Sequence, residues 1–366
     1  MFDLELSEEQ RLVHDTVASF ARDEIRPLAR PSDETGAIPQ AIVDKGFELG
    51  LVQGALPEEH GGYGEVRSAV TGAIVAEELA FGDLAIALHL LSPRLVAYPV
   101  LDLGTPEQRA RFLPRFAEAF HPAAAAVVEP RFDFDTMRYA TTARRDNGAW
   151  ILNGAKCFVP LAADSDVMLV LAQLAGAEQA QGAFLVERGA TGLAIGEREK
   201  NMGVKALATY EVTLKDVVVP AAMRLGGDDA ASLDLLVDRS RVALAALAVG
   251  VARAAYEYSR DYAKERKAFG VPIAQKQAIA FMLAEMAIEI DAARLLVWEA
   301  AWTIDRGKPA TRESALAKRY AASTVLKVAD NALQVLGGHG YVRDHPVELW
   351  LRNARGFTAF EGLAIV

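Results

Sequence analysis

The last third of the chain contains three long runs of helical periodicity, and these runs constrain the fold more than any other feature of the sequence. They cover residues 242–262, 275–305 and 313–336, and each is rich in Ala, Leu, Met and Lys. Each run is longer than a typical globular helix of about 11–12 residues. Helices with a long apolar stripe must bury that stripe against partners, so the runs predict a helical bundle to which a second subunit adds surface.

The rest of the chain shows two other patterns. Capping sequences at Ser7-Glu8-Glu9-Gln10 and Thr105-Pro106-Glu107-Gln108 predict helices in the first third. Short apolar or alternating runs, separated by Asn-Gly and other glycine turns, predict a small β domain in the middle. We therefore predict a mainly α-helical protein with an N-terminal helical domain (1–122), a central β domain (123–222) and a C-terminal helical bundle (223–366).

Composition and motif searches disfavour several classes of function. The 39 Lys and Arg against 49 Asp and Glu give a net charge of −10, so the chain as a whole has no positive electrostatic field that would attract nucleic acid. The six histidines are scattered and form no ligand pair with a nearby carboxylate, so we predict no metal site. The sequence lacks three motifs that mark common enzyme classes: Gly-x-Ser-x-Gly, the phosphate loop that ends in Gly-Lys-Ser/Thr, and Gly-x-Gly-x-x-Gly. Hydrolases, NTPases and Rossmann-type dinucleotide-binding proteins are therefore disfavoured.

Three features predict a cytoplasmic protein with no membrane partner. The N-terminal residues Met1-Phe2-Asp3-Leu4-Glu5 lack the basic and apolar pattern of a secretory signal. The most apolar run, residues 242–251, is far shorter than the roughly 20 residues that span a bilayer. The lone Cys157 cannot form an internal disulfide, which indicates a reducing compartment.

Two segments could contact a nucleotide-like ligand. Leu-Gly-Gly-His-Gly-Tyr at residues 336–341 follows a long helix, where glycines allow a helix stop or the close approach of a phosphate or ring. Arg266 stands near Phe269, a pairing that suits a pyrophosphate and a stacked heterocycle. A plain helix end and a solvated basic surface are the alternative interpretations.

One carboxylate near the C-terminal end is a candidate base. Glu361 is surrounded in sequence by Phe357, Phe360, Leu363 and Ile365. Removal of a carboxylate from water raises its pKa and makes it a better proton acceptor, so Glu361 could abstract a proton. An exposed glutamate at a helix end is the alternative.

Taken in order, several segments resemble the acyl-CoA dehydrogenase family of flavoproteins, over nearly the whole chain. The first signature is Tyr-Ala-Lys-Glu-Arg-Lys-Ala-Phe-Gly at residues 262–270, with Gln277-Ala278-Ile279 after it. The second is Gln-Val-Leu-Gly-Gly-His-Gly-Tyr at 334–341, followed by Phe360-Glu361-Gly362. Residues 201–206 and 217–220 are similar to the end of the family's β domain.

The resemblance implies a fold, a cofactor and an assembly. The family has an N-terminal helical domain, a central β-barrel and a C-terminal four-helix bundle, and it binds FAD. The residues matching the cofactor site of the family would be Arg266 and Phe269, which reach the FAD of a neighbouring subunit, together with Gln277, Gln334, Gly337, Gly338 and Phe158. A homo-oligomer, as a dimer or tetramer, is therefore expected, or a hetero-oligomer with a related subunit.

The resemblance also implies a reaction. Glu361 matches the base that takes the α-proton of an acyl-CoA, or of an acyl-carrier thioester, while the β-hydride moves to flavin N5. The product would be a trans-2-enoyl thioester, and electrons would leave through an electron-transfer flavoprotein. Asp238, Arg241 and Gly362 match positions near the thioester end of the substrate. Ser240 stands where some members carry the base instead, and a serine cannot take that role.

Several positions depart from the family pattern. Val128 replaces a threonine that bonds the flavin, and Phe134 replaces a serine that assists the coenzyme A arm. Pro160 lacks both a hydroxyl and a backbone donor for flavin N5, and Leu363 and Asn353 replace a threonine and an aspartate. These losses leave two alternatives open: a non-catalytic or half-site subunit of a mixed oligomer, and another oxidation on the same scaffold.

Overall fold

The computed structural model describes residues 5–176, 180–230 and 232–366. Seven α-helices precede the strands, and their bounds are α1 (Glu8–Phe20), α2 (Ala29–Thr35), α3 (Gln40–Glu48), α4 (Ala69–Gly82), α5 (Leu84–Leu90), α6 (Arg94–Leu103) and α7 (Pro106–Glu118). The predicted capping sequences begin α1 and α7. In both, the hydroxyl of Ser7 or Thr105 accepts from the backbone of the glutamine three residues on, whose side chain accepts in return.

Among the described residues, the middle of the chain forms one mixed sheet of seven strands. They are β1 (Ala124–Ala126), β2 (Thr142–Asp146), β3 (Ala149–Pro160), β4 (Val167–Leu174), β5 (Gln181–Glu187), β6 (Leu193–Arg198) and β7 (Thr209–Pro220). The pairing order is β1-β4-β2-β3-β7-β6, with β5 also on β4. The expected β domain is confirmed, but among the described strands no pairing joins β6 back to β1 or β5, so a closed barrel is not shown.

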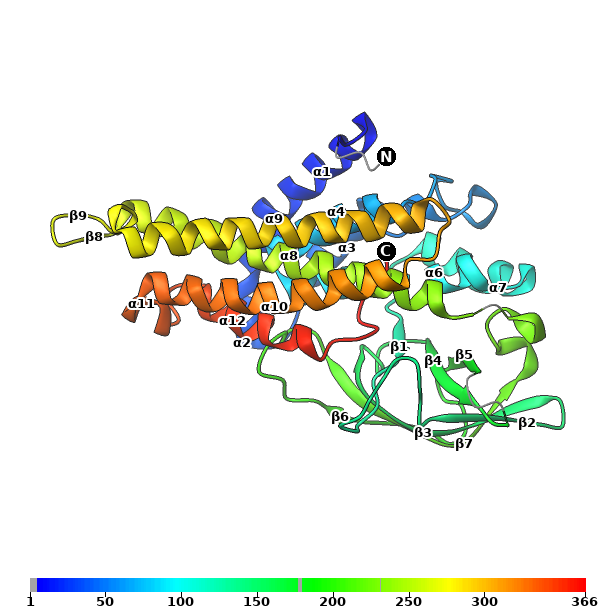
Figure 1. Ribbon diagram of the computed structural model, residues 1–366. Coiled ribbons are helices and arrows are strands. Elements are labelled where there is room, and N and C mark those ends of the chain that lie inside the picture. Colours follow the sequence, from blue (N-terminus) through cyan, green and yellow to red (C-terminus); the bar gives the residue numbers. More distant parts are fainter. Residues whose placement is uncertain (1–4, 177–179, 231) are drawn as a thin grey trace.

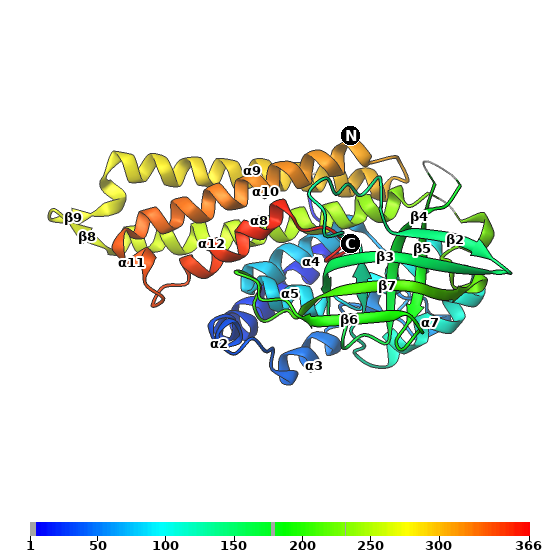
Figure 2. The same cartoon turned by 90° about the horizontal axis from the view of Figure 1, so that it is seen from below.

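The C-terminal part is built on three long helices, as the periodicity predicts. They are α8 (Asp234–Glu265), α9 (Gln277–Asp305) and α10 (Thr311–Leu336), followed by the shorter α11 (Gly338–Tyr341) and α12 (Val347–Arg355). A two-stranded hairpin, β8 (Lys267–Ala268) and β9 (Val271–Pro272), connects α8 to α9. Both views place the sheet beside one half of these helices, with the hairpin and α11 at the other end (Figures 1 and 2).

The buried side chains form two large clusters that cross the predicted domain limits. The first joins α1, α4 and α5 to α8, α9 and α10. The second joins α6 and α7 to the sheet. The N-terminal helices are therefore divided between the bundle and the β domain, which fixes the sheet relative to the long helices.

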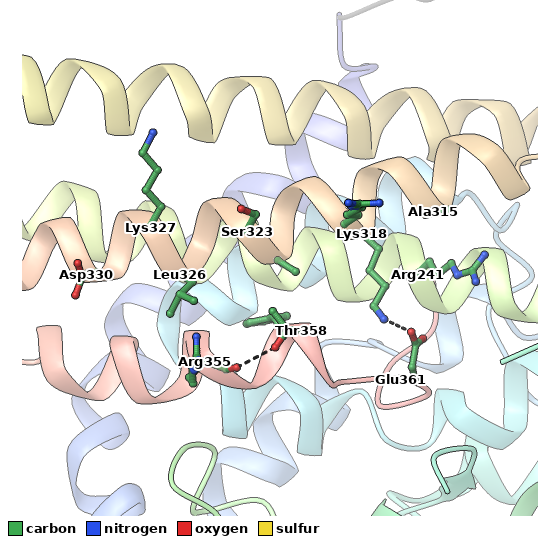
Figure 3. A pocket seen from close by; sticks show the side chains of 13 residues that line it. Arg241, Ala315, Lys318, Ser323, Leu326, Lys327, Asp330, Arg355, Thr358 and Glu361 are labelled. Carbon is green, nitrogen blue, oxygen red and sulfur yellow. Dashed lines mark hydrogen bonds and ion pairs between the residues drawn. The ribbon is translucent and has the colours of Figure 1, made fainter. Parts of the chain in front are cut away.

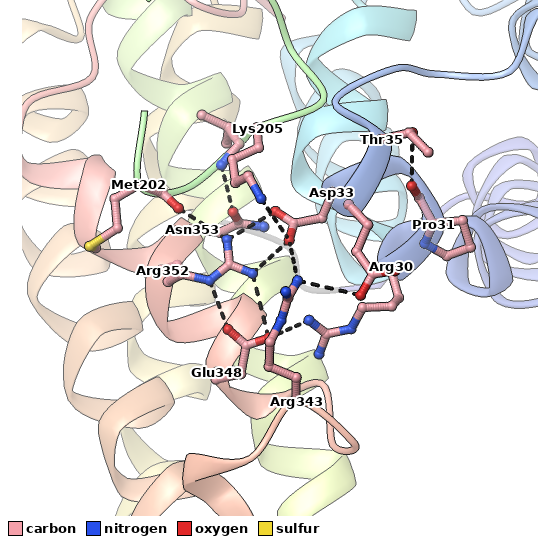
Figure 4. Close-up of polar contacts among 12 residues, drawn as sticks. Arg30, Pro31, Asp33, Thr35, Met202, Lys205, Arg343, Glu348, Arg352 and Asn353 are labelled. Carbon is pink, nitrogen blue, oxygen red and sulfur yellow. Dashed lines mark hydrogen bonds and ion pairs between the residues drawn. The ribbon is translucent and has the colours of Figure 1, made fainter. Parts of the chain in front are cut away.

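A network of charged side chains connects α2, α12 and the loop before β7 (Figure 4). Arg352 donates to both carboxylate oxygens of Asp33, at 2.9 and 2.8 Å, and to Glu348 at 2.7 Å. Arg30 also bonds Glu348. Asn353, one of the residues that depart from the family pattern, accepts a hydrogen bond from the backbone N–H of Val204 at 2.7 Å. These bonds fix the segment that leads from α12 toward Glu361.

No single helix in the described part of the chain is long and apolar enough to cross a bilayer, although α5 and α6 together, bent by 46°, meet that test of length and composition.

Candidate active site

A cavity of about 860 Å³ lies between α10, α8 and the segment that follows α12 (Figure 3). This volume is within the usual range for small-molecule sites. Its cationic lining residues outnumber its acidic ones. The cationic residues are Arg241, Lys318, Arg319, Lys327 and Arg355, and the acidic ones are Asp330 and Glu361. A cavity with this charge attracts anionic ligands, although the whole chain is acidic.

Glu361 lies on the wall of this cavity, and its side chain is only 17% exposed. Two close contacts hold the backbone on either side of it. The ring of Phe360 lies so close to Gly356 that a Cβ there would come within 2.1 Å of it. Gly362 has a φ of +66°, and a Cβ on it would lie 2.3 Å from Val127. The predicted base is therefore held at the cavity rather than exposed at a helix end.

Lys318 on α10 forms an ion pair with Glu361 across the cavity (Figure 3). Both side chains are mostly buried, at 15% and 17% exposure. Burial lowers the pKa of the Lys318 ammonium, and the attraction of Glu361 opposes part of that shift. Sequence reasoning missed Lys318, and a charged residue among the alanines of a buried helix face is the signal that could have found it.

Arg241 lines the same cavity and is anchored to the segment before β2. Its Nη2 donates to the hydroxyl of Thr136 at 3.2 Å. Tyr139 of that segment is buried, and burial, followed by the charge of Glu361, raises its pKa. The structure thus brings Arg241 and Glu361 together, as expected, and adds Thr136 and Tyr139 to their surroundings.

Asp238 does not line the cavity, although its sequence position suggested contact with the substrate. It is 4% exposed and accepts from the hydroxyl of Ser314 at 2.7 Å and from that of Thr311 at 3.2 Å. Both donors stand at the start of α10. Asp238 therefore fixes α10 against α8, a contact that depends on helix packing.

The residues expected to hold a cofactor for a neighbouring subunit lie together at the hairpin end of the bundle (Figure 1). Arg266, Gln277 and Gln334 are exposed, and Phe269 is 95% exposed. Phe269 and Gly270 have φ values of 55° and 84°, which make a tight two-residue turn that displays the phenyl ring. Open space surrounds Gly337 and Gly338, where an added Cβ would meet nothing within 4 Å.

Phe158 lies on the β-domain side of the molecule, in a second cavity of about 170 Å³. Met202, Arg352 and Phe360 also line it. Phe360 directly precedes Glu361, which lines the large cavity. The N–H of Phe158 donates to Glu199 at 3.1 Å, and Pro160 pairs with Thr209 in the sheet. This cleft has room beside an aromatic side chain, and the hairpin end offers exposed donors and open glycines. The residues of these two places therefore fit parts of a flavin dinucleotide.

Comparisons with known proteins identify the family of the chain. Models of the acyl-CoA dehydrogenase N-terminal, middle and C-terminal domains match residues 7–119, 124–217 and 232–364. An acyl-CoA dehydrogenase of Bacillus subtilis is 34% identical over 364 residues, which covers 98% of this chain and 96% of the relative.

Solved structures agree as well. Butyryl-CoA dehydrogenase from Megasphaera elsdenii matches with a TM-score of 0.89 and 30% identity, over 98% of this chain and 96% of that one. A glutaryl-CoA dehydrogenase from Mycobacterium smegmatis, in complex with FADH2, matches with a TM-score of 0.86 and 25% identity, over 98% and 92%. The chain belongs to the acyl-CoA dehydrogenase family and is an FAD-dependent oxidoreductase.

Proposed function

We propose that the protein oxidises an acyl-CoA thioester to the trans-2-enoyl-CoA, with Glu361 as the base. The observation that carries this proposal is the position of Glu361, a mostly buried carboxylate on the wall of a cationic cavity. A carboxylate in such a place is accessible to a substrate and little solvated, which favours proton abstraction.

The proposed reaction removes two hydrogens from neighbouring carbons. Glu361 takes the proton from the carbon next to the thioester, and the electron pair of that C–H bond becomes the second bond between Cα and Cβ. When bound, FAD supplies the acceptor, at N5, for the hydride that leaves Cβ. The base ends protonated, and the two electrons leave with the hydride.

The other cavity residues would hold the substrate. Arg241, anchored by Thr136, lines the cavity with Glu361 and is proposed to contact the thioester end, as is the backbone of Gly362, the next residue in the chain. Asp238 would act indirectly, by fixing α10 through Ser314. The cationic wall at Arg319, Lys327 and Arg355 suits the phosphates of a coenzyme A thioester.

The cofactor contacts are proposed for an oligomer. Phe158 would lie beside the flavin of its own subunit. The exposed residues at the hairpin end, Arg266, Phe269, Gln277, Gln334, Gly337 and Gly338, would contact the FAD of a neighbour in a homodimer or homotetramer. Electrons would leave to an electron-transfer flavoprotein, and we expect the reaction to take place in the cytoplasm.

The test is the visible spectrum of the purified protein, followed by anaerobic addition of a panel of acyl-CoA thioesters. The proposal predicts about one flavin per chain, loss of the oxidised flavin absorbance with at least one thioester, and an enoyl-CoA two mass units lighter than the substrate. A colourless homo-oligomer that cannot be reconstituted with FAD would favour a half-site subunit and overturn the proposal.

A further inference from the structure

We propose that Lys318 is the positioning residue for Glu361, holding the carboxylate in place on the cavity wall before substrate enters. This inference rests on the proposed function, because it assigns a role to a partner of the proposed base. Lys318 would touch the carboxylate and not the reacting carbon atoms.

The geometry places the ammonium opposite the carboxylate. Lys318 extends from α10, while Glu361 lies in the segment after α12, and their ion pair crosses the cavity (Figure 3). Within the described residues, the only hydrogen bond of the Lys318 ammonium is to Glu361. Both groups are mostly shielded from water, so their attraction is less screened than that of a surface pair.

Other charged and titratable groups face the same cavity, but their bonds differ. Arg241 on α8 bonds Thr136, and Tyr139, before β2, is buried with a raised pKa. Arg319 on α10 and Arg355 at the end of α12 also line the cavity, but within the described residues neither bonds Glu361. Lys318 is therefore the cation that contacts the carboxylate directly.

This contact can orient the base. A general base must be within hydrogen-bond reach of the proton that it takes, so a carboxylate that rotates away from the cavity is a poorer base. The ion pair with Lys318 restricts that rotation. The pKa of the Lys318 ammonium is lowered because burial removes water from the charged group. The ion pair with Glu361 offsets part of this loss of solvation.

The first test is the rate of flavin reduction at saturating acyl-CoA in the Lys318→Met holoenzyme. Loss of the contacting cation should lower this limiting rate about 10–100-fold, because the carboxylate is no longer held in position, while the acyl-CoA concentration that gives half the limiting rate should change less. Lys318→Arg keeps the charge and should restore most of the rate.

Lys45→Met is the matched control, because it removes a lysine that also pairs with a glutamate, Glu24 at 2.8 Å, but that does not line the cavity. Its limiting rate should not change. An unchanged limiting rate in Lys318→Met, or an equal loss in Lys45→Met, would overturn the inference.

The second test needs no flavin chemistry. In a double-mutant cycle, Lys318→Met and Glu361→Gln should each lower the denaturant midpoint, and the double variant should lower it by less than the sum. Additive effects would contradict the pairing. Glu361→Gln in the kinetic assay separates the two proposals. If this variant reduces flavin normally, the proposed function fails, whereas an inactive Glu361→Gln together with an unchanged limiting rate in Lys318→Met defeats only the role of Lys318.

Discussion

Gly362 packs against Val127 so closely that any side chain at position 362 would overlap it. A Cβ there would lie 2.3 Å from Cγ2 of Val127, and the backbone has a φ of +66°. Gly362 directly follows Glu361, so this contact between the end of the chain and the segment after β1 fixes the backbone that carries the candidate base.

Gly362→Ala should therefore destabilise the fold and slow flavin reduction. Gly307 is a matched control, because its φ is +65° but an added Cβ would meet nothing within 4 Å. Gly307→Ala should cost only the backbone strain, about 1–2 kcal/mol, whereas Gly362→Ala adds about 1–3 kcal/mol of overpacking. Denaturant unfolding measures both. Equal losses in the free energy of unfolding would show that Val127 does not constrain this turn. Adding Val127→Ala to Gly362→Ala should recover part of the larger loss.

The buried pair of Lys156 and Glu129 should be strongly sensitive to substitution. Lys156 donates to Glu129 at 3.1 Å, and the two side chains are 0% and 2% exposed. Lys156→Met should cost about 3–5 kcal/mol, because it leaves a buried carboxylate without its cation. Arg111→Met, which removes a partner of the 53%-exposed Glu187, should cost about 0–1 kcal/mol. Similar losses in both variants, measured by denaturant unfolding, would contradict this interpretation.

The network at Asp33 should make the fold sensitive to acid. Burial alone would raise the pKa of Asp33 and Glu348, but hydrogen bonds from Arg352 and nearby positive charges outweigh it and lower both. A lowered pKa stabilises the fold above the ordinary values of 3.8 and 4.5, and this contribution is lost as pH falls below them. The free energy of unfolding should therefore decrease below about pH 4.5.

Asp33→Asn is the check on that prediction. It should reduce the free energy of unfolding more at pH 7 than at pH 3, because part of the stabilisation from the lowered pKa is already lost below the ordinary value of 3.8. The variant removes the bidentate carboxylate partner of Arg352. A loss that is the same at both pH values would assign the acid sensitivity to other groups.

The exposed residues of the hairpin end should affect flavin binding without affecting the fold of one chain. Arg266→Ala and Gln334→Ala remove exposed side chains, so the circular dichroism spectrum should not change. The flavin-to-protein ratio after gel filtration should fall, because each loses a proposed contact across the subunit interface. Lys267→Ala, at an exposed neighbouring position, is the control. Full flavin retention in both variants would place the cofactor elsewhere.

The sequence predicted the parts of the fold that depend on local pattern. The capping boxes at Ser7 and Thr105 and the three long helices follow from residues close together in the chain. The order of the strands and the division of the N-terminal helices between two cores depend on contacts between distant segments, which a single sequence does not encode locally.

The same distinction applies to the candidate site. Glu361 could be identified because a motif carries it, and the structure places it at a cavity. The partners of Lys318 and Thr136 could not be identified in this way, because each residue meets its partner only after α10 and the segment before β2 pack against other elements. For the same reason, the position of Asp238 away from the cavity lining could not be predicted. Asp238 is close in sequence to Arg241, but its side chain accepts a hydrogen bond from Ser314.

The most direct test of the account is a single turnover of flavin reduction, followed anaerobically in the wild type and in Glu361→Gln at matched flavin content. The account predicts that an acyl-CoA reduces the wild-type flavin and that the variant does so about 10²–10⁴ times more slowly, because the base is gone. Reduction of the variant at the wild-type rate would contradict the central claim that Glu361 takes the proton.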